Sequence, residues 1–196
     1  GGEGFATILT RAARGREVVV NAADPLGVER AASFGLVRWA DVPSAAQKQL
    51  AMPATTRDDE LIAIVEMAAI SGLALLPADA RDPWQTTSRG TGELLRAAAD
   101  AGAAAIVLGV GGSATNDLGL GALAALGLTF HTASGDFVPD PIPVHWPQIA
   151  RIAGRVSPRL PPIAIACDVT NPLLGPRGAA AVYGPQKGLR VGDHAR

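Results

Sequence analysis

GVGGSATNDLGLGALAALG, residues Gly109–Gly127, follows directly on the apolar run Ala103–Leu108. A short apolar run of this kind, ended by glycines, predicts a buried strand. After the glycines, apolar residues return at the spacing of a helix. The chain here therefore predicts a strand, a loop of exposed main-chain N–H groups and a helix, which together form an α/β unit.

The glycine loop in this stretch is suited to binding an anion. Glycines let the main chain approach a ligand closely, several N–H groups can converge on it, and the next helix presents its positive end. We predict that this loop, with Gly111, Gly112, Ser113, Thr115 and Asn116, binds an anion. The alternative is a strand-to-helix turn without a ligand, capped by Asn116 or Asp117. A dinucleotide-dependent oxidoreductase is disfavoured, because the glycine spacing lacks that fingerprint.

The composition excludes several classes of function. The 196 residues include 17 Lys and Arg against 18 Asp and Glu, so the chain has no field that would attract nucleic acid or an anionic membrane. A single Cys excludes a disulfide framework and favours a reducing compartment. The longest apolar stretches, such as Ala97–Val110, are too short to span a bilayer. We expect a cytoplasmic protein, and the opening GGEGF, without Met, indicates an internal piece of a longer one.

The residues before the glycine loop predict part of a mixed α/β domain over 1–76. Its first helix is expected over Phe5–Arg14, with Gly15 closing it. A β-ribbon follows, because DPLG suits a tight turn between two apolar runs. We then expect a mobile loop over 41–59 and a buried strand in LIAIVEMA, with Glu66 at an edge or solvated position.

Residues 77–196 predict an α/β portion that carries the chemistry. A helical period over Glu93–Ala101 precedes the strand and the glycine loop. A second short apolar run, PPIAIACD, predicts a strand that ends at Asp168, and a small-residue helix is expected at AAAVY. The Pro-rich stretch Pro139–Pro147 predicts a surface connection.

Two further side chains follow these elements at places where ligands bind. Asp168 directly follows a strand, where a carboxylate can accept a hydroxyl proton or hold Mg²⁺. Lys187 lies between Pro185 and Gly188, where a backbone without bulky side chains can bring an ammonium group to a phosphate. A cap or ion pair for Asp168 and a solvated loop position for Lys187 are the alternatives. Cys167 is expected to be a small buried hydrophobe rather than a nucleophile.

Arg89 stands at the start of the predicted helix in TTSRGTGE. The helix dipole is positive there, so a cation is unfavourable unless it has an anionic partner. A guanidinium that binds a carboxylate through two hydrogen bonds would suit a small organic acid. The three histidines show no metal-ligand spacing, and we assign them no role.

Five motifs, taken in order, resemble the bacterial glycerate kinase family of the glyoxylate and glucarate catabolism type. They are DPLG, IVEMAAISGLALLP, TTSRGTGELLRAA, IVLGVGGSATND and ACDVTNPLLGPRGAAAVYGPQKG, within Gly1–Gly188. The resemblance implies a two-domain glycerate kinase type I fold, with a Rossmann-like domain and a second α/β domain, that is incomplete in this chain. The family's Asp-Ser-Phe-Lys-Gly and Gly-Glu-Gly-Arg segments are absent here, and Leu118 stands where the family has Gly.

The resemblance implies ATP-dependent phosphorylation of D-glycerate with Mg²⁺, with 2-phosphoglycerate favoured over 3-phosphoglycerate. Besides the phosphate-binding loop, it implies catalytic roles for Asp168, Asp117 and Lys187 and substrate binding by Arg89, Ser88 and Thr91. Asp168 and Asp117 are the implied Mg²⁺ ligands, and the division of base and metal duties between them stays open. A truncated, catalytically silent α/β module that binds a small anion is the alternative.

Overall fold

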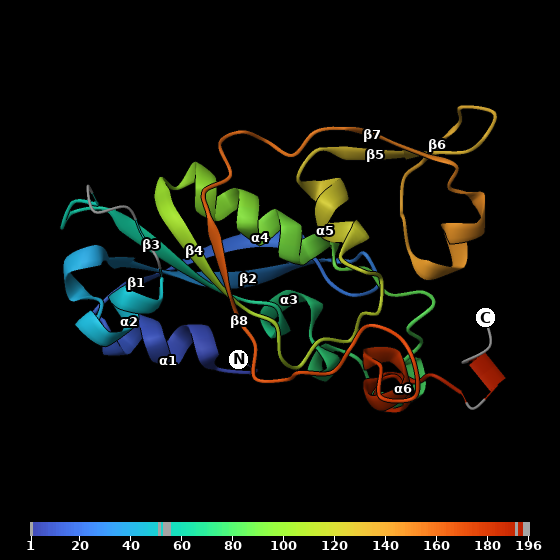
Figure 1. The fold of residues 1–196 in the computed structure, drawn as a ribbon, viewed down its shortest axis with the longest axis horizontal. Helices are drawn as coiled ribbons and strands as arrows, with labels where there is room; N and C mark the ends of the chain where they lie inside the picture. The colour runs from blue at the N-terminus through green and yellow to red at the C-terminus, as the bar shows by residue number, and fades with distance from the viewer. Residues whose placement is uncertain (1, 51, 53–55, 191, 194–196) are drawn as a thin grey trace.

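A mixed five-stranded sheet forms the centre of the computed structural model, which describes residues 2–50, 52, 56–190 and 192–193 (Figure 1). Its strand order is β1-β2-β3-β4-β8, with β1–β3 antiparallel and β3, β4 and β8 parallel. The bounds are β1 (Arg16–Ala23), β2 (Glu29–Arg38), β3 (Leu61–Glu66), β4 (Ala103–Gly109) and β8 (Ile163–Ala166). The predicted α/β class is confirmed.

Helices cover both faces of this sheet (Figure 1). One face carries α4 (Arg89–Asp100), with α3 (Ala68–Ser71) and α5 (Leu120–Ala125) beside it. The other face carries α1 (Phe5–Ala12) and α2 (Ser44–Gln49). Parallel strands need such cover because both of their faces are apolar.

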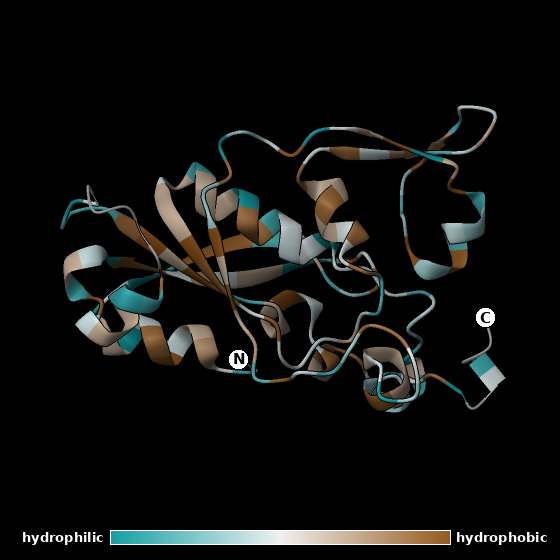
Figure 2. Ribbon diagram, in the orientation of Figure 1, coloured by the Kyte–Doolittle hydropathy of each residue, from teal (hydrophilic) through white to brown (hydrophobic). Residues whose placement is uncertain are grey.

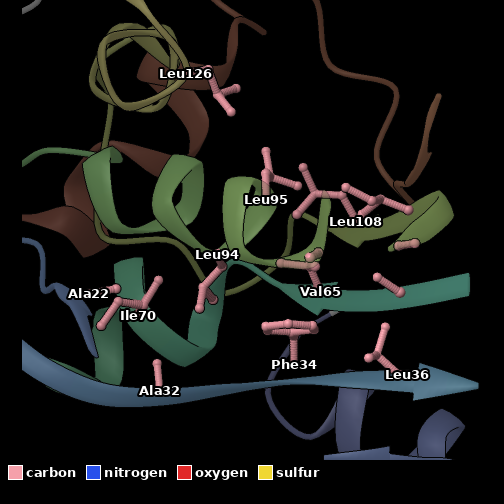
Figure 3. Close-up of a cluster of buried hydrophobic side chains, with 14 residues drawn as sticks. Ala22, Ala32, Phe34, Leu36, Val65, Ile70, Leu94, Leu95, Leu108 and Leu126 are labelled. Atoms are coloured by element: carbon pink, nitrogen blue, oxygen red, sulfur yellow. The ribbon is translucent and has the colours of Figure 1, made fainter. Parts of the chain in front are cut away.

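The larger core lies between α4 and the sheet. In Figure 3 Leu94 of α4 points towards the strands that carry Phe34 and Val65, whereas Leu95 lies beside Leu108 of β4; all of these side chains are buried. Figure 2 shows the same division by hydropathy, with the apolar residues concentrated on the central strands. The helical period predicted over Glu93–Ala101 is confirmed, because its apolar residues Leu94, Leu95 and Ala98 are buried by α4.

The β-ribbon is also confirmed. β1 and β2 pair from Arg16 with Leu36 to Ala23 with Glu29, and the DPLG turn joins them. Asp24 at the start of the turn is buried, and its carboxylate accepts the N–H groups of Leu26 and Val28. Such hydrogen bonds to the main chain are the reason that Asp favours this turn position.

A smaller antiparallel sheet, in the order β6-β5-β7, follows α5. Its strands are β5 (Leu128–His131), β6 (Phe137–Val138) and β7 (Arg151–Gly154), and the Pro-rich stretch forms the 3₁₀ helix η4 (Pro143–Gln148). Further short helices are η1 (Trp39–Asp41), η2 (Leu73–Leu75), η3 (Ala78–Ala80), α6 (Ala179–Tyr183) and η5 (Pro185–Lys187). Within the described ranges, no helix is long and apolar enough to cross a membrane.

Several local predictions are wrong. Arg14, not Gly15, takes the left-handed backbone conformation after α1, with a φ of 52°. Gly15 is needed for another reason, since a Cβ there would lie 2.5 Å from the carbonyl oxygen of Leu36. Glu66 is 5% exposed rather than solvated, and its carboxylate accepts the N–H groups of Gly4 and Ala6 at 2.9 Å each, which caps α1.

The segment over 41–59 contains α2, so it is not the unstructured loop that its composition predicts. Residues 51 and 53–55 of this segment lie outside the described residues. The predicted division at residues 76 and 77 stays a prediction, and the central sheet takes strands from both sides of it. β8 forms an edge of that sheet, and its Ile165 side chain is 63% exposed.

Leu94 offers a direct test of the core. Its side chain is fully buried, so Leu94→Ala removes apolar contacts and leaves a cavity. We expect the free energy of unfolding to fall by about 2–5 kcal/mol. The matched control is Leu174→Ala at a side chain 81% exposed, which should change it by less than about 0.5 kcal/mol. Chemical denaturation measures both, and equal effects would contradict this core.

Candidate functional site

The carboxyl ends of β3, β4 and β8 lie side by side at one edge of the sheet. Glu66 pairs with Gly109, and Gly109 pairs with Ala166 in the next strand. The loops that follow these strands therefore begin next to one another, which is where α/β proteins bind ligands. The glycine loop, defined here as Val110–Asp117, and the segment that begins at Cys167 share this edge.

The glycine loop is held in place by main-chain hydrogen bonds to the α3–η2 segment. The N–H of Leu73 donates to the carbonyl of Gly112, and the N–H of Ala114 donates to that of Ser71, both at 2.8 Å. Gly112 has a φ of 74°, which favours glycine, and it is exposed. The N–H groups of Gly111, Gly112 and Ser113 have no acceptor within the described residues, so they remain for a ligand.

Lys187 reaches this loop from far along the chain. Its Nζ donates to the hydroxyl of Ser113 at 2.8 Å and to the carbonyl of Thr115 at 2.6 Å. The next residue, Gly188, has a φ of 97°, and a Cβ there would lie 2.1 Å from the carbonyl oxygen of Arg81. That close approach fixes the backbone beside Lys187. The structure thus brings the predicted cation onto the predicted phosphate-binding loop.

Burial makes the ammonium group of Lys187 less stable. It lowers the pKa of Lys187 from 10.5 to about 8, and the carboxylate of Asp117 opposes the shift. The side chain is therefore still mostly protonated at neutral pH. A phosphate bound at the loop would add negative charge beside this poorly solvated cation, so the two would stabilise each other.

Asp117 joins the starts of α4 and α5. It is 2% exposed, and its Oδ2 accepts the N–H and the hydroxyl of Ser88 at 2.8 and 2.7 Å and the N–H of Gly121 at 3.2 Å. Its Oδ1 accepts the N–H of Gly119 at 3.2 Å. The capping expected of Asn116 or Asp117 is thus performed by Asp117. These four bonds occupy most of the acceptor positions that Mg²⁺ would need.

Asp168 is exposed directly after β8, at the edge where the glycine loop also begins. Mg²⁺ usually keeps several waters and takes only one or two carboxylates together with substrate phosphates, so an accessible Asp168 fits that ion better than Asp117 does. No cluster of three or more metal-ligating side chains occurs in the part of the chain that the structure describes. Cys167 is exposed, so the prediction that it is buried is wrong.

The residues predicted to bind an organic acid lie at the start of α4, but only Arg89 borders open space. Its Nε donates to Oε1 of Glu93 at 3.1 Å, and the side chain lines two cavities of about 360 and 400 Å³. Ser88 and Thr91 are buried, and the Thr91 hydroxyl lies 2.8 Å from that of Ser71. The hydroxyls of Ser88 and Thr91 thus bond within the protein.

Two carboxylates near the site have hydrogen-bond partners that the sequence did not indicate. Glu93 accepts the N–H of Ala23 at 2.8 Å as well as Nε of Arg89, and Glu66 caps α1 beside the glycine loop. The spacing of four residues between Arg89 and Glu93 on one helix could have indicated their pairing. No local signal marks the bonds of Glu66, because they come from residues about sixty positions away.

The fold and the site define an α/β protein whose candidate ligand-binding residues follow the ends of parallel strands. The side chain of Lys187 contacts the glycine loop there. A model of the glycerate kinase family matches residues 1–195. The chain is 42% identical to the glycerate kinase of Bacillus subtilis (strain 168) and 41% identical to the glycerate 2-kinase of Escherichia coli (strain K12), each over 191 residues. The chain therefore belongs to the glycerate kinase family.

The matched relatives are much longer than this chain. The alignments cover 96% of this chain but 44% of the B. subtilis protein and 45% of the E. coli protein. A crystal structure assigned to glycerate kinase 2 of Salmonella typhimurium LT2 superposes with a TM-score of 0.80 at 39% identity, over 99% of this chain and 47% of that one. The 196 residues thus span just under half the length of these relatives.

The lowered pKa of Lys187 predicts a specific pH dependence of stability. Between pH 8 and 10.5 the unfolded chain holds a proton on Lys187 that the folded chain has lost, so the free energy of unfolding should rise with pH in this window. Below about pH 8 both states are protonated and the contribution is constant. Chemical denaturation of the wild type and of Lys187→Met across this range should give a difference in the free energy of unfolding that grows with pH. Parallel curves would contradict the burial of this ammonium group.

Proposed function

We propose that these residues form part of an ATP-dependent kinase that phosphorylates D-glycerate. The observation that carries the proposal is the ammonium group of Lys187 on the glycine loop, 2.8 Å from the Ser113 hydroxyl, in a chain of the glycerate kinase family. Phosphoryl transfer needs little covalent chemistry from the protein. It needs a cradle for the phosphates, neutralisation of their charge and an oriented hydroxyl.

The glycine loop supplies the cradle. The N–H groups of Gly111, Gly112 and Ser113 remain for phosphate oxygens, while Lys187 neutralises charge beside them. Thr115 and Asn116 complete the proposed loop contacts. Because Lys187 already bonds to the Ser113 hydroxyl, a bound phosphate would receive a donor array that is assembled in advance.

Asp168 is the proposed catalytic carboxylate. It lies exposed at the sheet edge that the glycine loop shares, where it can accept the proton of the attacking hydroxyl or hold Mg²⁺. When bound, Mg²⁺ would neutralise charge on the phosphates of ATP. Asp117 is proposed as a positioning residue. It accepts a hydrogen bond at the start of α4, and its negative charge favours the protonated form of Lys187.

We further propose that the 2-hydroxyl of D-glycerate is the acceptor, which gives 2-phosphoglycerate. The name of the E. coli relative, glycerate 2-kinase, supports this choice over the 3-hydroxyl. The acid would be held by its carboxylate at Arg89. The position of the transferred phosphate can be read by phosphorus NMR of the product.

A chimera tests the proposal, because the chain spans under half of its relatives. Residues 1–195 replace the matching segment of the B. subtilis glycerate kinase, and ADP release is measured with ATP, Mg²⁺ and D-glycerate. We expect turnover that depends on D-glycerate. A folded chimera that binds pyrophosphate without turnover would instead support a catalytically silent anion-binding module.

Asp168→Asn in the chimera should lower turnover by about 10²–10⁴-fold, as expected for loss of a catalytic acid or base. The melting temperature should stay unchanged, because the side chain is exposed. Asp100→Asn is the matched control: this exposed carboxylate ends α4 and should leave turnover unaffected. Near-normal turnover of the Asp168 variant would remove this residue from the mechanism.

A further inference from the structure

Two cavities meet at Arg89, and their linings differ in the number of charged groups. The first, of about 360 Å³, carries two carboxylates and two guanidinium groups: it is lined by Asn21, Glu29, Arg89, Glu93 and Arg96. The second, of about 400 Å³, lies against the DPLG turn and is called here the turn cleft. It is lined by Leu26, Gln85, Thr87, Arg89, Asp140 and Ile142.

The polar groups of the first cavity are already paired. The amide of Asn21 donates to Glu29 at 3.0 Å, and Nη1 of Arg96 donates to the carbonyl of Ala125 at 3.0 Å. In the turn cleft, Arg89 lies beside the exposed amide of Gln85 and beside Thr87, whose hydroxyl accepts the main-chain N–H of Arg89 at 3.2 Å. The turn cleft thus offers one cation and neutral polar groups to a small hydroxy acid, while the exposed carboxylate of Asp140 at the same cleft opposes its negative charge.

Glu93 determines which nitrogens of Arg89 remain for a ligand. Its Oε2 accepts the N–H of Ala23 at 2.8 Å at the end of β1, and its Oε1 accepts Nε of Arg89 at 3.1 Å. The carboxylate is thus fixed by the backbone and in turn fixes the guanidinium. The two terminal nitrogens of Arg89 are left to bind a carboxylate in the bidentate arrangement.

We propose that the turn cleft binds the carboxylate of a small hydroxy acid through Arg89, and that Glu93 is the positioning residue that orients this arginine. The inference rests on the proposed function, because the hydroxy acid would be the phosphoryl acceptor. It adds to that function a binding cleft between the DPLG turn, the start of α4 and the segment at Asp140. The first cavity is excluded as the binding site of the acid.

The turn cleft borders the phosphate-binding region. A Cβ at Gly121 would lie 2.3 Å from Oγ1 of Thr87 and 2.9 Å from Oδ2 of Asp117, so the wall of the cleft abuts the carboxylate that faces Lys187. The start of α5 therefore lies directly against the Thr87 wall of the turn cleft. This contiguity is what transfer of a phosphoryl group from the glycine loop requires.

Asp140 offers a test in which the substitution is expected to tighten ligand binding. Its exposed carboxylate lines the turn cleft and repels an acid there. Asp140→Asn should therefore tighten the binding of D-glycerate by about twofold or more, which an unfolded or damaged variant cannot mimic. A cleft made for a cation would respond in the opposite direction.

The experiment measures D-glycerate binding to the chimera by calorimetry, with pyrophosphate as a probe of the glycine loop. Arg89→Gln should weaken D-glycerate binding by about tenfold or more, as expected for loss of a charged hydrogen bond. Glu93→Gln should weaken it by about threefold or more and raise KM for D-glycerate but not for ATP. The matched control Asn21→Ala, which changes only the first cavity, should leave both probes unaffected.

The inference is overturned if Asn21→Ala weakens D-glycerate binding and Arg89→Gln does not, or if Asp140→Asn weakens it. It is also overturned if Glu93→Gln changes the affinities for D-glycerate and pyrophosphate equally, since that would indicate a general structural role. The proposed function fails separately: the binding results would hold as expected while no phosphorylated product forms.

Discussion

The buried carboxylate of Asp117 is the contact on which the candidate site depends. Two helices that are distant in the sequence, α4 and α5, begin at this one side chain, which accepts main-chain N–H groups from both. A buried charge is stable only when it is hydrogen-bonded or paired, and here four hydrogen bonds meet that need, while Lys187 supplies a positive charge nearby. These hydrogen bonds position Arg89 at the start of α4 relative to the glycine loop that ends at Asp117.

Sequence patterns predicted the elements well, and the partners of charged groups poorly. The apolar spacing of α4 and the glycines after β4 are local signals, and the rule for strand ends placed the glycine loop and Asp168 at one edge. The contact of Lys187 with Ser113 needs the close approach of Gly188 to Arg81, which no local pattern reveals. Cys167 was expected to be buried because an apolar run does not show that its strand lies at an edge of the sheet.

Leu118 shows how firmly the loop is shaped by its surroundings. This residue, which is not glycine, keeps a left-handed φ of 54°, and Gly119 follows with a φ of 73°. A left-handed conformation costs a residue other than glycine about 1–2 kcal/mol. The hydrogen bonds of Asp117 to Gly119 and Gly121 hold the turn in this conformation. The end of the loop therefore depends on a side chain as much as on glycine backbone freedom.

β8 is bonded to a neighbour on one side only, and its Ile165 side chain is largely in water. An edge of this kind offers free main-chain donors and acceptors to any other extended segment. Natural proteins blunt such edges with charges or proline, but β8 reads IAIA and has neither. This short strand therefore presents an uncharged edge of the described sheet to which an extended segment can add by main-chain pairing.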